Sequence, residues 1–184
     1  MVMIYTAEQD ADYRLRALWT LHVTGGLEEA ELLKATSDRD QHIRAWAVQL
    51  LCEDGAPSRK VQERFVKMSR EDSSAVVRLY LASALQRLAK PDRWDIASGL
   101  VSHAGDANDH NLPKMIWYGV EPAVPDDPER AVALASGSKI PLLTRYIARR
   151  LTAARSFEEL VGAIGRAGDN RKDLLFGMRD GLDG

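Results

Sequence analysis

The sequence predicts an all-α fold in which about five helix pairs stack into a right-handed α-α superhelix. Three observations indicate it: an apolar pattern that returns every 28 to 35 residues, helical spacing of the apolar residues within each copy, and no segment that alternates with a period of two. With 184 residues the chain is long enough for one domain with a sizeable core, so residues 1–184 are predicted to form a single domain.

The repeated pattern is clearest in four stretches, "DYRLRALWTLHV", "DQHIRAWAVQLL", "SAVVRLYLASAL" and "IPLLTRYIARRL". Each has an arginine just before an apolar run, at Arg16, Arg44, Arg78 and Arg145. A fifth copy, "DHNLPKMIWYGV", places Pro113 in the arginine position. Apolar residues recur one before, two after and seven after this position, which is the spacing of one buried helix stripe. These stretches are therefore predicted to be the second helices of the pairs.

Shorter amphipathic segments lie between these stretches and are predicted to be the first helices: "LEEAELLKAT", "PSRKVQERFVKM", "PDRWDIASGLVSHA", "DDPERAVALAS" and "SFEELVGAIGRAG". Helix-start residues support several of them, such as Ser58, Asp127 and a capping box of Ser156 with Glu159. The repeats then span roughly residues 8–26, 27–54, 57–89, 91–122, 126–154 and 156–182.

A repeat of this length fits helix-turn-helix repeats. The recurrent Val-Arg or Ile-Arg pair near the start of the second helix favours the HEAT or armadillo class, and HEAT in particular. Tetratricopeptide repeats have a similar length, but their Trp, Gly-Tyr and Pro pattern is missing. Asp12, Asp40, Ser74 and Asp109 stand four residues before the arginine position, where we expect helix caps. The arginines themselves are expected either to stack on a neighbour or to pair with an Asp of the adjacent repeat.

Charge and cysteine content restrict the function classes. The chain has 25 Lys and Arg against 27 Asp and Glu, so no overall field attracts nucleic acid or an anionic membrane. Residues 139–179, however, carry nine basic and four acidic side chains. Cys52 is the only cysteine, which excludes an intrachain disulfide and a multi-cysteine metal or haem motif. Neither a signal-peptide pattern nor a run of 18 apolar residues occurs, so this segment is not expected to insert into a membrane.

The stretch "DANDHNLPKMIWYGVEP", residues 106–122, is the densest in functional side chains. A metal hypothesis would use His103, Asp106, Asp109 and His110, but their spacing matches no compact ligand motif. We expect Asp109 to cap a helix instead. The sequence predicts no catalytic residue, no metal site and no cofactor site.

Trp117 and Tyr118 remain after capping is accounted for. Trp117 is larger than its counterparts in the other repeats, so it either fills a gap between unequal repeats or anchors a partner. Arg145, Arg149 and Arg150 form a basic cluster, which is either a solvated face or a site for a phosphate or an acidic partner. The predicted interaction surface comprises Trp46, Tyr80, His110, Trp117, Tyr118, Glu121, Arg145 and Arg149.

Six stretches, "DYRLRALWTLHVTGG", "HIRAWAVQLLCED", "VVRLYLASALQRL", "DHNLPKMIWYGVEP", "RYIARRL" and "DLLFGMRDGL", together resemble the HEAT-repeat portion of large haem-binding proteins of planctomycetes and related bacteria, also labelled membrane-bound dehydrogenases. In that family this portion lies between a propeller similar to sugar dehydrogenases and a cytochrome-c-like domain with a Cys-x-x-Cys-His motif. This chain has neither, so the resemblance implies an excised module of an exported parent, without the parent's redox activity.

The sequence thus predicts a non-catalytic scaffold or protein-interaction module whose partners are proteins or neighbouring domains of a parent chain. The alternative is a nucleic-acid-binding protein similar to HEAT-like DNA glycosylases, which bind DNA on a concave face. Such proteins need a broadly basic groove, whereas residues 1–138 carry 16 basic against 21 acidic side chains. Nucleic acid is therefore not the expected partner.

Overall fold

The computed structural model describes residues 10–183, which contain only helices and their connections and no strand. The α-helices are α2 (Ala11–Val23), α3 (Glu29–Ala35), α4 (Gln41–Leu50), α5 (Arg59–Glu71), α6 (Ala75–Ala84), α7 (Trp94–Leu100), α8 (Leu112–Val120), α9 (Pro128–Gly137), α10 (Pro141–Ala153), α11 (Phe157–Arg166) and α12 (Arg171–Leu182). Four short 3-10 helices join them: η1 (Leu85–Arg87), η2 (Lys90–Asp92), η3 (Ala104–Asn108) and η4 (Glu121–Ala123).

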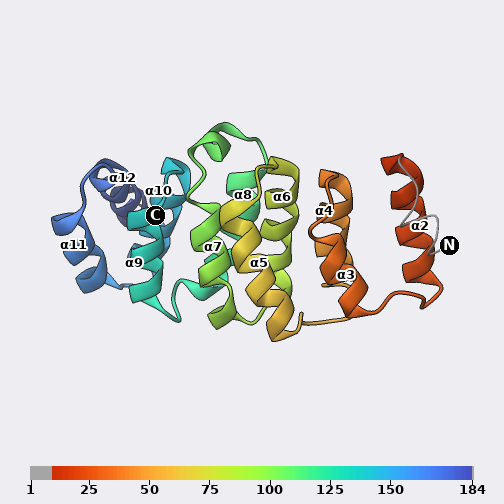
Figure 1. The fold of residues 1–184 in the computed structure, drawn as a ribbon. Coiled ribbons are helices and arrows are strands. Elements are labelled where there is room, and N and C mark those ends of the chain that lie inside the picture. Colours follow the sequence, from red (N-terminus) through yellow and green to blue (C-terminus); the bar gives the residue numbers. More distant parts are fainter. Residues whose placement is uncertain (1–9, 184) are drawn as a thin grey trace.

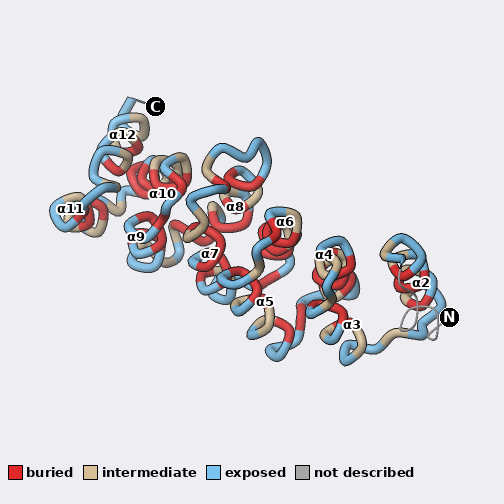
Figure 2. The backbone as a smooth tube through the Cα atoms, turned by 45° about the horizontal axis from the view of Figure 1, so that its top comes forward, coloured by how far each residue is buried: buried red, intermediate tan, exposed pale blue. Residues whose placement is uncertain are grey.

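The helices form two rows that run side by side along the molecule, with α2 at one end and the α11–α12 pair at the other (Figures 1 and 2). One row contains α3, α5, α7, α9 and α11, and the other contains α2, α4, α6, α8, α10 and α12. Contacts link α4 to α6, α6 to α8, α8 to α10 and α10 to α12 within the second row, and α5 to α7, α7 to α9 and α9 to α11 within the first. The all-helical prediction is confirmed.

The core lies between the two rows, where Figure 2 shows the buried residues facing inward. Val77 and Leu81 of α6, and Ile116 and Val120 of α8, are each four residues apart and fully buried. This spacing places them on one side of their helix, as the sequence pattern predicts. Each such side chain contributes about 1.5–3 kcal/mol through burial, which is the main force that holds the rows together.

Polar side chains at predicted positions cap five of the eleven α-helices in residues 10–183, α4, α5, α6, α8 and α9. The Asp40 carboxylate accepts hydrogen bonds from the amides of His42 and Ile43, at 2.8 and 3.2 Å, and Ser74 Oγ accepts one from Val77. Ser58 and Asp127 cap α5 and α9, as predicted. Each of these bonds satisfies an amide that has no partner within its own helix.

Two predicted caps are wrong. Asp10, rather than Asp12, caps α2, and its carboxylate accepts from the amide of Asp12 at 2.8 Å. Ser156 stands at the start of α11, but its side chain makes no capping hydrogen bond. A capping box forms instead at α3, between Glu28 and Glu31. Helix starts depend on where the chain turns, and sequence signals place them only within one or two residues.

The last two helices of the second row, α10 and α12, pack with their backbones unusually close together. A Cβ atom at Gly177 would collide with the carbonyl oxygen of Arg145, and one at Gly181 would lie 2.7 Å from Thr152 Cβ. Two glycines one helical turn apart therefore give α12 a flat side against α10. This close approach fixes the position of the C-terminal helix, which carries part of the surface described below.

Candidate interaction face

Buried arginines of the second row each reach an aspartate in the next repeat. Arg44 of α4 donates to both carboxylate oxygens of Asp72, at 2.7 and 2.8 Å, and also to the backbone carbonyl of Asp38 at 2.9 Å. Arg78 of α6 repeats the arrangement with Asp106, at 2.6 Å for both bonds, and with the carbonyl of Asp72 at 2.8 Å. Each arginine thus joins the connection before its own helix to the connection before the next helix of the second row.

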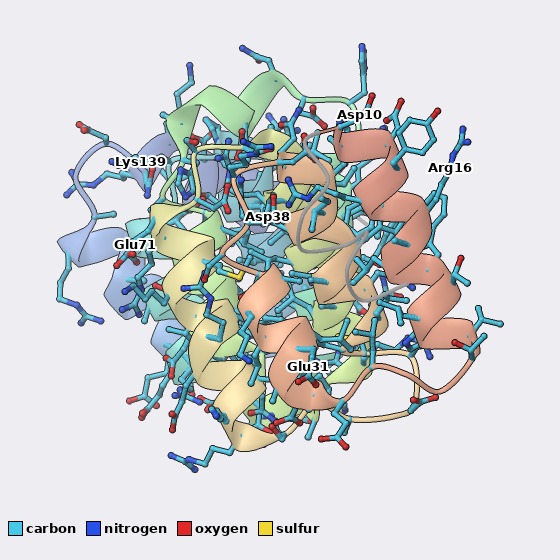
Figure 3. The ribbon with its side chains drawn as sticks, turned by 45° about the vertical axis from the view of Figure 1, so that its right-hand side comes forward. Asp10, Arg16, Glu31, Asp38, Glu71 and Lys139 are labelled. Atoms are coloured by element: carbon cyan, nitrogen blue, oxygen red, sulfur yellow. The ribbon has the colours of Figure 1, made fainter. Side chains whose placement is uncertain are left out.

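The first pair of this series is Arg14 with Asp38, not the predicted Arg16. Arg16 is exposed, extends outward from α2 in Figure 3, and lies over the ring of Tyr13 with its Cζ atom 5.9 Å from the ring centre. The arginine of each pair stands four residues after the helix cap. Because Asp10 and not Asp12 caps α2, this position is Arg14 and not Arg16. We call the three pairs Arg14–Asp38, Arg44–Asp72 and Arg78–Asp106 the Arg–Asp ladder.

The charged groups of the Arg–Asp ladder are paired with one another inside the fold. Arg78 is only 7% exposed and Asp106 only 4%, so neither is accessible to a partner. Burial opposes the ionisation of Asp72, but hydrogen bonds from Arg44 and from the Ser74 amide, with the charges of Arg44 and Arg78, outweigh it and lower its pKa. The predicted structural role of the arginines at positions 44 and 78 is confirmed.

Arg145 and Arg150 of α10 also make ion pairs, and Arg145 reaches an Asp of the following helix pair, as expected. Arg145 donates to Asp180 of α12 at 2.6 Å, and Arg150 donates to Glu121 at 2.6 Å. Both pairs are partly exposed. They tie α10 to its two neighbours in the second row, α12 and α8.

The four residues of the metal hypothesis have other partners. His103 Nε2 donates to the carbonyl of Ser69 at 2.8 Å, and Asp106 is held by Arg78. Asp109 accepts hydrogen bonds from the amides of Asn111 and Leu112, both at 2.8 Å, so it caps α8 as predicted. The hydrogen bonds from Leu112 and then Asn111 also lower its pKa. Residues 10–183 contain no group of three or more His, Cys, Asp or Glu side chains arranged to hold a metal ion.

Aromatic side chains follow one another along the outer side of the second row. The rings of Trp19 and Trp46 meet edge to face with centres 4.8 Å apart, and Tyr80 follows with its ring centre 6.1 Å from that of Trp46. Further along, the Trp117 and Tyr146 rings are tilted with centres 5.4 Å apart. All three separations suit favourable ring contacts.

Counting from the capping residue of each second-row helix explains this arrangement. Six positions after the cap stand Arg16, Trp46, Tyr80, Met115, Tyr146 and Phe176, and nine positions after it stand Trp19, Gln49, Ser83, Tyr118, Arg149 and Arg179. The two sets are three positions apart, which is close to one helical turn. Both sets therefore lie on the same side of each helix. We call these twelve residues the aromatic face.

Two open grooves lie along the aromatic face. The first, of about 390 Å³, lies over α4, α6 and α8 and is lined by Trp46, Gln49, Leu79, Tyr80, Ser83, Asn111 and Met115. The second, also of about 390 Å³, lies between α8 and α10 and is lined by Lys114, Trp117, Tyr118, Tyr146, Arg149, Arg150 and Ala153. We call the second the basic groove. Their volumes fall in the range of ligand pockets, about 300–1,000 Å³.

The structure brings together most of the residues predicted for an interaction surface. Trp46 and Tyr80 line the first groove, and Trp117, Tyr118 and Arg149 line the basic groove. Glu121 lies next to the basic groove through its ion pair with Arg150, whereas Arg145 does not line this groove and pairs with Asp180 of α12. His110 is exposed in the connection before α8 and lines neither groove.

Sequence analysis missed Lys114, Met115 and Tyr146. Tyr146 was hidden by aligning Arg145 with Arg44 and Arg78, because the structural equivalent in α10 is Thr144, one residue earlier. With the capping residues as reference, Tyr146 falls in the same position as Trp46 and Tyr80. The signal was present in the sequence, but it becomes visible only when the true helix starts are known.

Within residues 10–183, no helix combines the length and the apolar character needed to cross a lipid bilayer. No protein-family model, curated protein or solved structure matches this chain.

Proposed function

We propose that this chain is a non-catalytic helical-repeat module of the HEAT or armadillo class, wound as a right-handed superhelix, that binds a protein partner on its aromatic face. The single observation that carries the proposal is the recurrence of large, partly exposed side chains six and nine positions after successive helix caps. Tyr, Trp, Met and Arg are the residues that contribute most to protein interfaces, and they are the main residues at these positions.

The second-row helices carry two separate groups of side chains, the Arg–Asp ladder and the aromatic face, and their different positions support the proposal. The buried arginines of the Arg–Asp ladder fix the distance between repeats, and their charges are neutralised inside the fold. The aromatic face projects from the same helices on a side that no other helix within residues 10–183 covers, as the two open grooves indicate. Such an arrangement suits a rigid surface that presents side chains at regular intervals.

The resemblance to the HEAT-repeat portion of haem-binding proteins extends the proposal. The module would act as a spacer or docking segment of a larger, exported protein, and it would hold an electron donor near an electron acceptor without taking part in the reaction. The isolated chain is then expected to turn over neither a sugar nor a redox dye. Activity on either that survives rigorous repurification would overturn the non-catalytic assignment.

Site-directed photo-crosslinking tests the docking role. A photoreactive phenylalanine derivative placed at Tyr118, which is 57% exposed on the aromatic face, should crosslink to a discrete protein or domain in extracts of the source organism. The same derivative at Lys60, exposed on α5 of the opposite row, is the matched control. Crosslinking that is equal at both positions would contradict the proposal. The crosslink at Tyr118 should also be lost in two further variants: one that combines Trp46→Ala with Tyr80→Ala, and one that carries Trp117→Ala alone.

A second test addresses the family. Propeller and cytochrome domains of the resembled proteins, each produced separately, are titrated with this chain. Binding by either domain that weakens in a Trp117→Ala, Tyr118→Ala variant would place the docking site at the basic groove. Absence of binding to both would remove the link with that family and leave the crosslinked protein as the partner to identify.

Nucleic-acid binding is the competing function, and the cluster of Lys114, Arg149 and Arg150 beside Trp117 and Tyr146 is the observation that favours it. The first groove, in contrast, is lined by no cationic side chain. A protein that follows a nucleic-acid backbone needs basic side chains along its whole groove. A salt-dependent gel shift with DNA near physiological ionic strength would favour the competing function.

A further inference from the structure

We propose that the basic groove and the adjoining surface of α12 bind an acidic peptide segment that carries an aromatic or aliphatic side chain. This inference rests on the proposed docking function and names the chemistry of the partner. It follows from three features of the groove: cations without an internal partner, an aromatic site of suitable size, and a second set of cations one helix further along.

Two cations of the groove are not neutralised by the fold. Lys114 and Arg149 are exposed, and neither side chain takes part in an ion pair or hydrogen bond within residues 10–183. Arg150, beside them, is paired with Glu121 at 2.6 Å. Other exposed cations, such as Lys34 and Lys60, also have no ion pair within the described residues, but Lys114 and Arg149 line one groove together with aromatic side chains. This combination makes the groove a site for external carboxylates.

The aromatic part of the groove provides the apolar contact. Trp117 and Tyr146 have tilted rings 5.4 Å apart, and Tyr118 beside them is 57% exposed. An apolar side chain of the partner can pack against these rings while neighbouring carboxylates reach Lys114 and Arg149. Rigid aromatic side chains of this kind contribute much contact area at a small entropic cost.

The positive surface continues onto α12. Arg145, Lys172 and Arg179 each place a cationic group within 6 Å of the Phe176 ring centre, at 5.6, 5.5 and 5.1 Å respectively. Arg145 and Arg179 share one carboxylate, that of Asp180, and Lys172 has no ion pair within the described chain. Two guanidinium groups and one ammonium group therefore meet a single internal negative charge.

The dimensions suit a short extended peptide. Packed helices lie about 8–10 Å apart, so the path from α8 over α10 to α12 is about 20 Å long. An extended chain covers about 3.3 Å per residue, so about six residues span this path. Two or three carboxylates among six residues would match the available cations. This local match distinguishes a peptide from a nucleic acid, whose regularly spaced phosphates would continue over the uncharged lining of the first groove.

The test is a selection from a display library of random peptides against the whole chain, followed by affinity measurement with one synthetic peptide of the enriched sequence. Enriched peptides should be acidic and contain an aromatic or aliphatic residue. Their affinity should fall about tenfold or more in a Lys114→Glu, Arg149→Glu variant. It should also fall as the salt concentration rises. A Lys34→Glu, Lys60→Glu variant, which reverses two exposed charges on the opposite row, should bind as the unaltered chain does.

The other outcomes are distinguishable. Enriched peptides without acidic residues, or binding that depends on Trp46 and Tyr80 but not on Lys114 and Arg149, would overturn this inference and leave the docking function standing. A failure to enrich any peptide would overturn both the inference and peptide docking on the aromatic face. Single-stranded oligothymidylate that displaces the enriched peptide and binds more tightly would make nucleic acid the occupant and overturn the inference.

Discussion

Arg78 and Asp106, 28 residues apart in the sequence, form two parallel hydrogen bonds of 2.6 Å, from Nε to Oδ2 and from Nη2 to Oδ1. The two side chains come from consecutive repeats, and both are almost fully buried. Because the planar guanidinium group matches the two carboxylate oxygens, the pair sets both the distance and the orientation between repeats.

Removing one partner of this pair should be costly. The substitution Asp106→Asn leaves the buried Arg78 charge uncompensated, and we expect the free energy of unfolding to fall by about 3–5 kcal/mol. Urea unfolding monitored by circular dichroism measures it. Asp180→Asn is the matched control, because the Asp180 carboxylate pairs with arginines at a partly exposed site, and the loss of stability there should be much smaller. Equal losses for the two variants would contradict the structural role of the buried pair.

The position of the first ladder pair gives a second prediction. Arg14→Ala removes the partner of Asp38, whereas Arg16→Ala removes only a side chain that lies over the Tyr13 ring. We expect Arg14→Ala to lower the midpoint of thermal unfolding clearly and Arg16→Ala to leave it almost unchanged. A larger effect for Arg16→Ala would restore the arginine alignment predicted from the sequence.

The lowered pKa of Asp72 links the ladder to pH. Because the folded pKa lies below the unfolded value of about 3.9, ionised Asp72 stabilises the fold above that value, and the contribution is lost as the pH falls through the folded pKa. The difference in the free energy of unfolding between the unaltered chain and Asp72→Asn should therefore be constant near neutral pH and shrink in acid. Urea unfolding over a series of pH values measures it. A difference that grows towards acid pH would show the opposite sign of the shift.

The contact between α10 and α12 should not tolerate a side chain. Gly177→Ala places a Cβ atom against the Arg145 carbonyl and should destabilise the fold by about 1–3 kcal/mol. Gly165→Ala is the control, because a Cβ atom at this position of α11 meets no neighbour within 4 Å. That substitution should stabilise the fold by about 0.5–1 kcal/mol, since alanine favours the helix. Thermal unfolding of both variants measures these changes in stability. Stabilisation by Gly177→Ala would contradict the close packing of α10 and α12.

Cys52 should be chemically inert in the folded chain. Burial raises the pKa of its thiol to about 11, although the charge of Arg87 opposes this. At about pH 8 roughly one thiol in a thousand is then ionised, and the thiolate is the reactive form. A disulfide reagent should modify Cys52 slowly under native conditions and rapidly in denaturant. Rapid modification of the native chain would show that the thiol is accessible.

The sequence by itself determined the helical class and the approximate positions of most helices. The apolar residues of the second helices recur with helical spacing, and caps such as Asp40, Ser74 and Asp109 indicate their starts. These signals are local, because a helix forms from contacts between residues three or four positions apart and a cap satisfies amides within one turn. That is why the helical class and the structural role of Arg44 and Arg78 could be predicted.

The tertiary structure decided which arginine pairs with which aspartate and which side chains share the outer side of the second row. Asp10 rather than Asp12 begins α2, and Thr144 rather than Arg145 is the equivalent of Arg78. A shift of one residue rotates a helix by about 100°, so errors too small to matter for a helix assignment move a side chain to another side. Tyr146, Trp117 and Arg149 line one groove because the packing between α8 and α10 fixes the rotation of both helices. The sequence alone does not give this rotation.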